Sequence, residues 1–152
     1  MLAFIQPAHE GYIHECDVIA RECESAAKGA LGWVRRDSMF DAIHNKTMCV
    51  ALSFASESVR GFVIWSAPSR GANKGWHVVH SIAVDILHQR EGVGSVLLNS
   101  VPLPIRLKCP VEVGKQPHPN PANEFYAAMG FTLMGTDTTT SGKLLNVWEK
   151  TA

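Results

Sequence analysis

Residues 80–98 read HSIAVDILHQREGVGSVLL, and the rest of the chain is organised around this stretch. An apolar run at 82–84 ends at Asp85, and a segment with two glycines, Gly92 and Gly94, precedes the next apolar run at 96–98. This pattern predicts a strand, a glycine-containing turn and a helix. Glycines let the backbone approach a ligand, and the unpaired N–H groups of a first helical turn attract anions. We therefore expect a phosphate or pyrophosphate at this turn.

The spacing of the glycines separates this turn from two common phosphate-binding motifs. The dinucleotide fingerprint G-x-G-x-x-G needs a third glycine where this chain has Leu97, and the Gly-Lys-Ser/Thr run of a Walker motif is absent. Gln89, Gly92 and Gly94 instead satisfy the pattern Q/R-x-x-G-x-G/A. This pattern resembles the acyl-CoA-binding turn of the GNAT N-acetyltransferase superfamily. An ordinary strand-to-helix turn is the alternative interpretation.

A second resemblance to the same family lies further along the chain. The run Asn120-Pro121-Ala122-Asn123-Glu124-Phe125-Tyr126, followed by Gly130-Phe131, resembles the family's N-x-A-x-x-F-Y-x-x-x-G-F helix. The two motifs come in the order that the family has. The resemblance covers residues 75–149 through its motifs, and the first half of the chain through its order of elements.

Length and composition are those of an ordinary globular protein. The 152 residues suffice for one hydrophobic core, so we expect a single domain over 1–152. With 14 basic and 14 acidic side chains the formal net charge is zero. No overall field therefore favours nucleic acid or an anionic membrane surface.

Cysteine spacing and the N-terminal segment bear on metal binding and location. The four cysteines form no C-x-x-C pair and have no neighbouring histidine at ligand spacing, so we expect no metal site. Small buried thiols in a reducing compartment are the simplest interpretation. The chain starts without the basic and apolar regions of a signal peptide, and no apolar run is long enough to span a membrane. We expect a cytoplasmic protein.

Hydrophobic periodicity divides the chain into elements. We expect strands at 2–5, 47–54, 59–65, 76–84, 105–109, 131–135 and 144–150, and loops at 68–75 and 110–121. We expect helices at 10–28, 37–44 and 120–129, and one that opens at the glycine turn and stops near Ser100. Gly29 and Gly32 mark the end of the first helix. Asn120 is the expected N-cap of the last helix, and Gly130 its left-handed terminus.

The order of these elements, β-α-α-β-β-β-α-β-α-β-β, is that of the GNAT fold. A strand, a crossover helix and another strand imply a parallel pair. We therefore expect an α/β (α+β) fold with a GNAT-like mixed, mainly antiparallel sheet. The resemblance implies that a splayed parallel pair lies in the middle of this sheet, with about four helices around it.

The resemblance implies an N-acetyltransferase that moves an acetyl group from acetyl-CoA, its co-substrate, to a primary amine by direct attack. The expected cofactor-binding residues are Ile82, Ala83, Val84, Gln89, Arg90, Glu91, Gly92, Val93, Gly94, Ser95, Asn123 and Tyr126. The acceptor stays open among a small amine, an aminoglycoside-like compound, a peptide amine and a nucleotide-borne amine. The family also implies a possible homodimer.

Two catalytic roles follow from the resemblance. Tyr126 matches the family's tyrosine, whose phenol, with a pKa of about 10, can donate a hydrogen bond or a proton to the departing sulfur. Family members often carry a base on the strand before the turn, where this chain has His77 and His80. An imidazole with a pKa of about 6.5 can accept a proton near neutral pH. We take His80 as the first candidate, while His77, Glu112 and water remain alternatives.

In GNAT proteins the region of the first two helices borders the acceptor site. Here this region carries Trp33, Arg35, Arg36, Met39 and Phe40, which core packing explains for the most part. Two other functions stay open. One is a non-catalytic acyl-CoA-binding or interaction module on the same fold, since a fold does not fix an activity. The other is a phosphate-binding α/β domain of a different kind.

Overall fold

The computed structural model describes residues 3–25, 34–114 and 118–152, and the chain forms two compact units. The first unit comprises Met1–Ser66 and His80–Val101, and the second comprises Ala67–Val79 and Pro102–Ala152. Strand β4 (His77–Val84) contributes residues to both units. The expected single domain stays a prediction. The predicted end of the first helix at 28–29 and the residue Trp33 lie outside the described residues.

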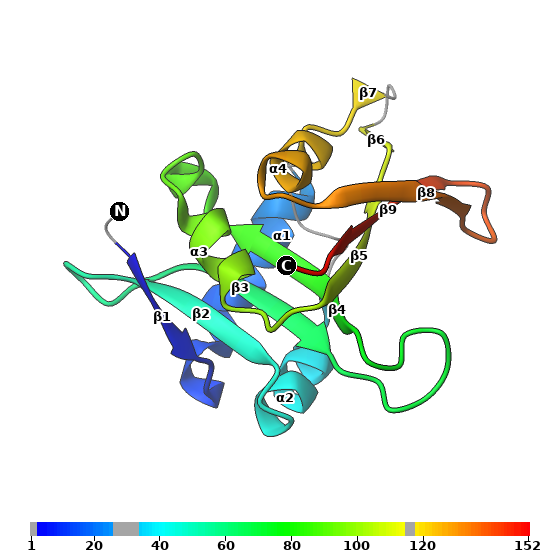
Figure 1. Ribbon diagram of the computed structural model, residues 1–152. Helices are drawn as coiled ribbons and strands as arrows, with labels where there is room; N and C mark the ends of the chain where they lie inside the picture. The colour runs from blue at the N-terminus through cyan, green and yellow to red at the C-terminus, as the bar shows by residue number, and fades with distance from the viewer. Residues whose placement is uncertain (1–2, 26–33, 115–117) are drawn as a thin grey trace. The chain divides into compact units, whose positions relative to one another are not determined.

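The first unit is a sheet with helices on both faces (Figure 1). Its strands, in sheet order, are β1 (Ala3–Pro7), β2 (Met48–Ser53), β3 (Val59–Ser66) and β4. The pairs β1–β2 and β2–β3 are antiparallel. The helical elements are η1 (Glu10–Tyr12), α1 (Ile13–Ser25), α2 (Arg36–His44), η2 (Ile86–His88) and α3 (Val93–Asn99).

Alternating side chains divide the core of this unit between the two faces of the sheet. Helices α1 and α2 cover one face and α3 covers the other (Figure 1). On the α1 face, Phe62 of β3 and Cys16 of α1 belong to one fully buried cluster. From α3, Leu97 and Leu98 are also fully buried. Helices α1 and α3 are stabilised mainly by burial of an apolar side, because short helices are marginally stable on their own.

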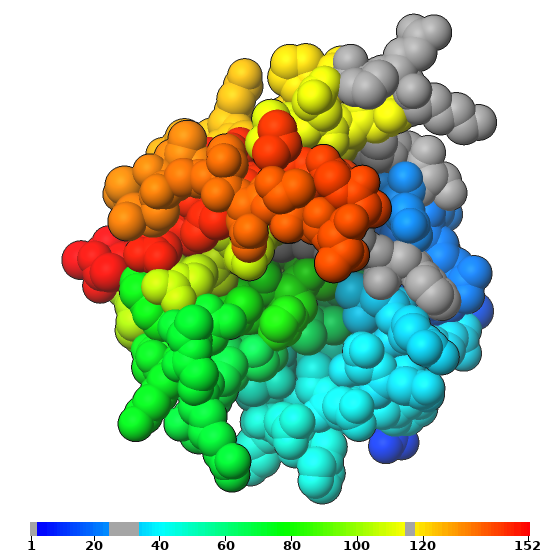
Figure 2. Space-filling view, turned by 90° about the vertical axis from the view of Figure 1, so that its right-hand side faces the viewer, coloured from blue at the N-terminus to red at the C-terminus, as the bar shows by residue number. Residues whose placement is uncertain are grey.

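The second unit is built on the strands β5 (Ile105–Pro110), β9 (Leu144–Lys150) and β8 (Thr132–Thr138), in that order. Residues His77–Val79 of β4 pair in parallel with Ile105–Leu107 of β5, and the other pairs are antiparallel. Helix α4 is Ala122–Ala128, and β6 (Glu112–Val113) pairs with β7 (His118–Pro119). All of β8 is exposed, and the β8–β9 hairpin lies at the surface in Figure 2.

The predicted mixed, mainly antiparallel sheet with one parallel pair is confirmed, together with four α-helices among the described residues. The splay of the parallel pair stays a prediction. The loop predicted at 110–121 is wrong in part, because β6 and β7 form a short ribbon there. Its prolines are tolerated because a two-stranded ribbon has free edges that need no N–H donor.

The predicted cap of α4 is displaced by one residue. Pro121 is the N-cap, but the Asn120 side-chain oxygen accepts a hydrogen bond from Ala122 N–H at 3.1 Å. Asn120 thus satisfies a free amide of the first turn from just outside the helix. At the other end, Gly130 has a φ of 88° and follows the C-cap Met129, as predicted.

Gly61 of β3 allows a close approach of β4 and α3. A Cβ atom at this position would come to 2.6 Å from the Ala83 carbonyl oxygen and 3.0 Å from a methyl carbon of Leu97. We predict that Gly61→Ala lowers the free energy of unfolding by about 1–3 kcal/mol, as overpacking does, in urea titration. The nearer obstacle is backbone, so adding Leu97→Val should not restore stability. Equal unfolding free energies for Gly61→Ala and the wild type would contradict this reasoning.

Candidate functional site

Asp85 ends β4 and starts the predicted turn. Its N–H donates to the Arg60 carbonyl of β3 at 2.8 Å, which holds the last part of the strand in place. Its side chain accepts from Leu87 N–H at 3.1 Å, and its carbonyl accepts from His88 N–H at 2.8 Å. These bonds shape η2, so the chain turns sharply after β4 rather than continuing as a strand.

The Val84 carbonyl joins the turn to both neighbouring elements. It accepts from the Gln89 side-chain amide at 3.2 Å and from the Cys23 thiol of α1 at 3.1 Å. Burial raises the pKa of Cys23 to about 11, so the group stays a thiol and remains a donor at neutral pH. The glutamine of the motif therefore has a structural task here, because it ties the turn back to the strand.

Helix α3 begins as the sequence predicts. Gly92 is its N-cap with a φ of 85°, a conformation that favours glycine, and Arg90 has a φ of 66°. The first helical bond runs from Val96 N–H to the Gly92 carbonyl at 3.2 Å. The amides of Val93, Gly94 and Ser95 therefore precede the helical ladder and have no acceptor within it. The strand, glycine turn and helix predicted from 80–98 are confirmed.

Three side chains beside the turn, those of Arg60, His88 and Glu91, contact one another in series. The sequence motif did not predict these contacts. His88 Nδ1 lies 3.0 Å from a Glu91 carboxylate oxygen, and His88 Nε2 contacts the Arg60 guanidinium. Since a guanidinium only donates, Nε2 accepts and Nδ1–H donates to Glu91. Glu91 is half-exposed and turned to His88 rather than capping α3 through its side chain. The i, i+3 spacing of His88 and Glu91 was the available signal.

The β4 residues expected to face the cofactor are largely buried. Ile82 and Ala83 are 4% and 1% exposed, and Val84 is half-buried. Their place is downstream of Val79, the last residue of β4 that pairs with β5.

The two histidines of β4 have different surroundings. His80 belongs to the first unit, and its Nε2 lies 2.7 Å from the Ser66 hydroxyl. The residue as a whole is exposed, but partial desolvation of the ring lowers the pKa of His80, so the ring is neutral at pH 7 and has a lone pair to accept a proton. His77 belongs to the second unit, where Nδ1–H donates to the Pro104 carbonyl at 3.1 Å. That bond gives His77 a structural role, because it holds the segment before β5.

Tyr126 is buried within the second unit, with 1% of its surface exposed. Its ring packs against Phe131 and Trp148, with centroids 5.8 and 6.4 Å away. Burial, and to a smaller extent the neighbouring Cys109, raise the pKa of Tyr126 above its ordinary range. The phenol therefore stays neutral and is a hydrogen-bond donor rather than a ready source of a proton.

The Asn123 amide is committed to the second unit. Its oxygen accepts from Trp148 Nε1 at 2.9 Å and from Asn146 at 3.1 Å. Its nitrogen donates to the carbonyls of Pro110 at 3.0 Å and Asn120 at 3.3 Å. These four bonds use the ordinary capacity of an amide. A cofactor contact by Asn123 stays a prediction, and it would require one of these bonds to be exchanged.

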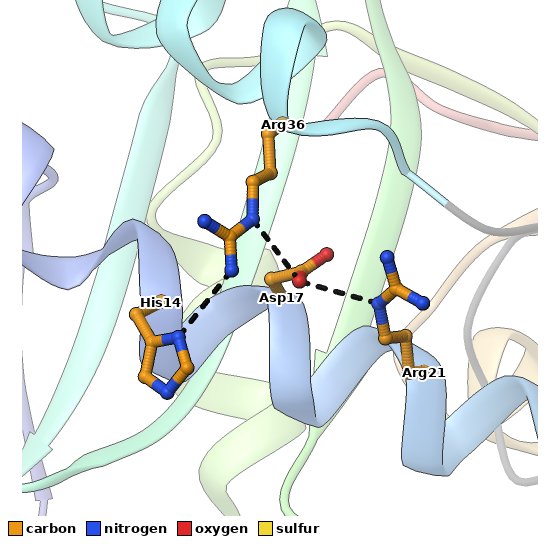
Figure 3. A network of polar contacts seen from close by, with 4 residues as sticks. All are labelled: His14, Asp17, Arg21 and Arg36. Atoms are coloured by element: carbon orange, nitrogen blue, oxygen red, sulfur yellow. Dashed lines mark hydrogen bonds and ion pairs between the residues drawn. The ribbon is translucent and has the colours of Figure 1, made fainter.

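Asp17 joins α1 to α2 (Figure 3). In the GNAT family, which the sequence resembles, this region borders the acceptor site. One of the Asp17 carboxylate oxygens accepts from Arg21 and Arg36, each at 3.2 Å. The other oxygen is buried and has no hydrogen-bond partner. Arg36 also contacts His14 at 3.3 Å. Arg36 is thus part of a structural network.

Of the other residues named for this region, Met39 is fully buried, as core packing requires. Phe40 is 44% exposed and Arg35 is exposed, so both side chains remain accessible.

Within the second unit, the Arg106 side chain holds the loop 68–75. The Arg106 guanidinium donates to the Ala72 carbonyl and the Asn73 side chain, both at 3.0 Å, and lies 4.1 Å above the Trp76 ring. It also pairs with Glu149 at 2.8 Å. These contacts fix the loop at its middle and its end.

No group of three His, Cys, Asp or Glu side chains suited to a metal ion is present in residues 3–25, 34–114 and 118–152. Over the same residues, none of the helices has the length and apolar character needed to cross a lipid bilayer.

Comparison with known proteins identifies the fold. No protein-family model and no curated protein matches the chain. Among solved structures, NAA60 from Arabidopsis thaliana in complex with acetyl-CoA has a TM-score of 0.74 and 12% identity, over 99% of each chain. Arabidopsis thaliana Naa50 with the bisubstrate analogue CoA-Ac-MVNAL has a TM-score of 0.71 and 13% identity, over 100% of each chain.

A third solved structure extends the comparison to bacteria. Ribosomal-protein-alanine N-acetyltransferase from Brucella melitensis has a TM-score of 0.71 and 15% identity, over 98% of this chain and 99% of that one. At these identities the likeness establishes the fold. The chain has the fold of the GNAT acetyltransferases, as its sequence predicts.

Proposed function

We propose that this chain is an acetyl-CoA-dependent N-acetyltransferase that moves an acetyl group to a primary amine. The observation that carries the proposal is the turn after β4. Gln89 ties it to the strand, Gly92 takes the left-handed conformation, and the amides of 93–95 are left outside the helical ladder. The same fold binds acetyl-CoA in NAA60.

The residues of the turn fit the pyrophosphate of acetyl-CoA. The free amides of Val93, Gly94 and Ser95 supply donors, and each favourable charge contact at a helix start is worth about 0.3–2 kcal/mol, so several must act together. Arg90 adds a charge-assisted contact, while the Glu91 carboxylate is hydrogen-bonded to His88. The pantetheine amides are expected to pair with the main chain near Ile82 and Val84, as an added strand would.

The reaction needs a base and a stabilised leaving group. In direct attack, the amine nitrogen forms a bond to the thioester carbon, the carbon–sulfur bond breaks, and the amine loses a proton. His80 is proposed to take that proton, because its ring is neutral at pH 7. Tyr126 is proposed to donate a hydrogen bond to the departing sulfur. His77, Glu112 and water remain alternatives for the base.

The acceptor is proposed only as a primary amine. The Naa50 structure contains a peptide-based analogue, and another neighbour is an aminoglycoside 6'-N-acetyltransferase complexed with coenzyme A. A screen should therefore include peptides with a free α-amine and aminoglycosides. A cytoplasmic location and a homodimer are further expectations. A non-catalytic acyl-CoA-binding module is the alternative function, and it would bind the cofactor without turnover.

The proposed turn can be tested with Gly94→Glu, which places a carboxylate among the free amides without demanding an unusual φ. We predict that acetyl-CoA and CoA bind the wild type in calorimetric titration and ATP does not. Gly94→Glu should weaken the binding of acetyl-CoA by at least about tenfold, or 1.4 kcal/mol. Asn99→Glu, which adds the same charge at the exposed end of α3, should bind normally. A folded, cofactor-free wild type that binds no CoA species would refute the proposal.

The role of His80 can be tested through pH. Its lowered pKa predicts that kcat/KM rises with pH through an inflection below about 6.5, because only the neutral ring accepts a proton. His80→Gln should lower turnover and remove this inflection. His44→Gln, an exposed histidine at the end of α2, should keep the wild-type profile. An unchanged profile in His80→Gln would assign the base to His77, Glu112 or water.

The role of Tyr126 can be tested with Tyr126→Phe, which removes only the hydroxyl. We predict a loss of about a hundred- to a thousandfold in kcat, the range for one donor to a developing charge. Affinity for acetyl-CoA should stay unchanged in calorimetry. Normal turnover in a folded variant would show that the phenol serves packing against Phe131 and Trp148 alone.

A further inference from the structure

The first unit contains a pocket that adjoins the proposed acetyl-CoA turn and shares Glu91 and Val93 with it. It has a volume of about 380 Å³, within the range of small-molecule sites. Its lining comes from the start of β1, the β2–β3 hairpin, η2 and the start of α3, through Ala3, Ser53, Phe54, Ala55, Arg60, His88, Glu91 and Val93. All of these residues belong to one compact unit.

The lining of this pocket carries one cationic side chain, Arg60, and one carboxylate, Glu91. The Arg60 side chain is half-buried, and among the residues that the structure describes no carboxylate forms an ion pair with it. Within the described part of the chain its side-chain partner is His88, which accepts through Nε2 and turns Nδ1–H to Glu91. The imidazole therefore separates the guanidinium from the Glu91 carboxylate. A guanidinium has five N–H donors, so most of the donors of Arg60 remain for a ligand.

The lining of the pocket also includes an apolar wall. Phe54 is 63% exposed, which is unusual for an aromatic side chain, and Phe4 supports its ring at a centroid distance of 4.9 Å. Ala3, Ala55 and Val93 complete this wall. An exposed ring in the same pocket as a guanidinium that has no carboxylate partner suits a ligand with an apolar body and one anionic group.

We infer that this pocket binds a small monocarboxylate that carries an aromatic or branched aliphatic body. The carboxylate takes the free N–H groups of Arg60, and the body packs on Phe54 and Val93. A cationic amine is less suited to this place, because Glu91 is engaged by His88 while the guanidinium has unused donors. The site shares Glu91 and Val93 with the glycine turn but requires neither Tyr126 nor the amides of Gly94 and Ser95, so it can be tested apart from acetyl transfer.

The test uses the full chain, labelled with nitrogen-15, without acetyl-CoA. Phenylacetate is titrated against phenylacetamide, which has the same shape without the charge, and against acetate, which lacks the ring. We expect saturable amide shifts with phenylacetate at Phe54, Ala55, Arg60, His88 and Glu91. Phenylacetamide should bind at least about tenfold more weakly, a difference of about 1.4 kcal/mol. Acetate should give no saturable shifts at these residues.

Variants locate the charge. Arg60→Gln should weaken phenylacetate by at least about tenfold, whereas Arg70→Gln, an exposed arginine of the second unit, should bind it normally. If Arg60→Gln does not fold, the comparison of acid and amide in the wild type decides. Equal affinity for acid and amide, unchanged binding in Arg60→Gln, or shifts absent from the pocket residues would each overturn the inference. Loss of acetyl-CoA binding would leave it intact.

Discussion

The hydrogen bond from Asp85 N–H to the Arg60 carbonyl fixes where β4 ends, and the candidate site of the first unit depends on that point. One residue earlier, the Val84 carbonyl is held by Gln89 from the turn and by Cys23 from α1. The strand end is therefore attached to the sheet, to a helix and to its own turn at once. Because α3 starts a fixed number of residues later, at Gly92, these bonds also set the direction of its free amides. A buried carbonyl without hydrogen-bond partners would cost about 1–3 kcal/mol. The end of β4 is therefore fixed by hydrogen bonding of its polar groups as much as by packing.

Packing adds a second constraint on the end of β4 and the position of α3. Gly61 lies beside the Ala83 carbonyl and Leu97, so β3, β4 and α3 come closer than any side chain at that position would permit. The hydrogen bonds select the end of the strand, and the missing Cβ lets the helix lie against it. Arg60, the residue before this glycine, then directs its carbonyl to Asp85 and its side chain to His88. One β3 segment therefore contributes to the turn through backbone and to the adjoining pocket through its side chain.

Local patterns explain how much could be predicted from the sequence. The hairpin of β2 and β3, the start of α3 at Gly92 and the end of α4 at Gly130 each follow from periodicity or from a conformation that glycine favours. The β6–β7 ribbon was missed because its pairs are two residues long and contain proline. The contacts of Arg60 with His88, and of Asn123 with Trp148, join residues 28 and 25 positions apart, and no local pattern specifies such pairs. The same limit applies to the role of Asn123, whose motif position suggested a cofactor contact while its amide is used inside the second unit.

The two candidate catalytic groups share an electrostatic property that a family motif alone does not supply. Burial lowers the pKa of His80 and raises that of Tyr126, so both favour the uncharged form at neutral pH. An uncharged imidazole is ready to accept a proton, whereas an uncharged phenol with a raised pKa gives one up less readily than a free tyrosine. If both act in the proposed reaction, they cannot be equivalent members of one proton relay. In the reaction that we propose, His80 removes the proton and Tyr126 stabilises the sulfur through a hydrogen bond, and the leaving thiolate acquires its proton from water.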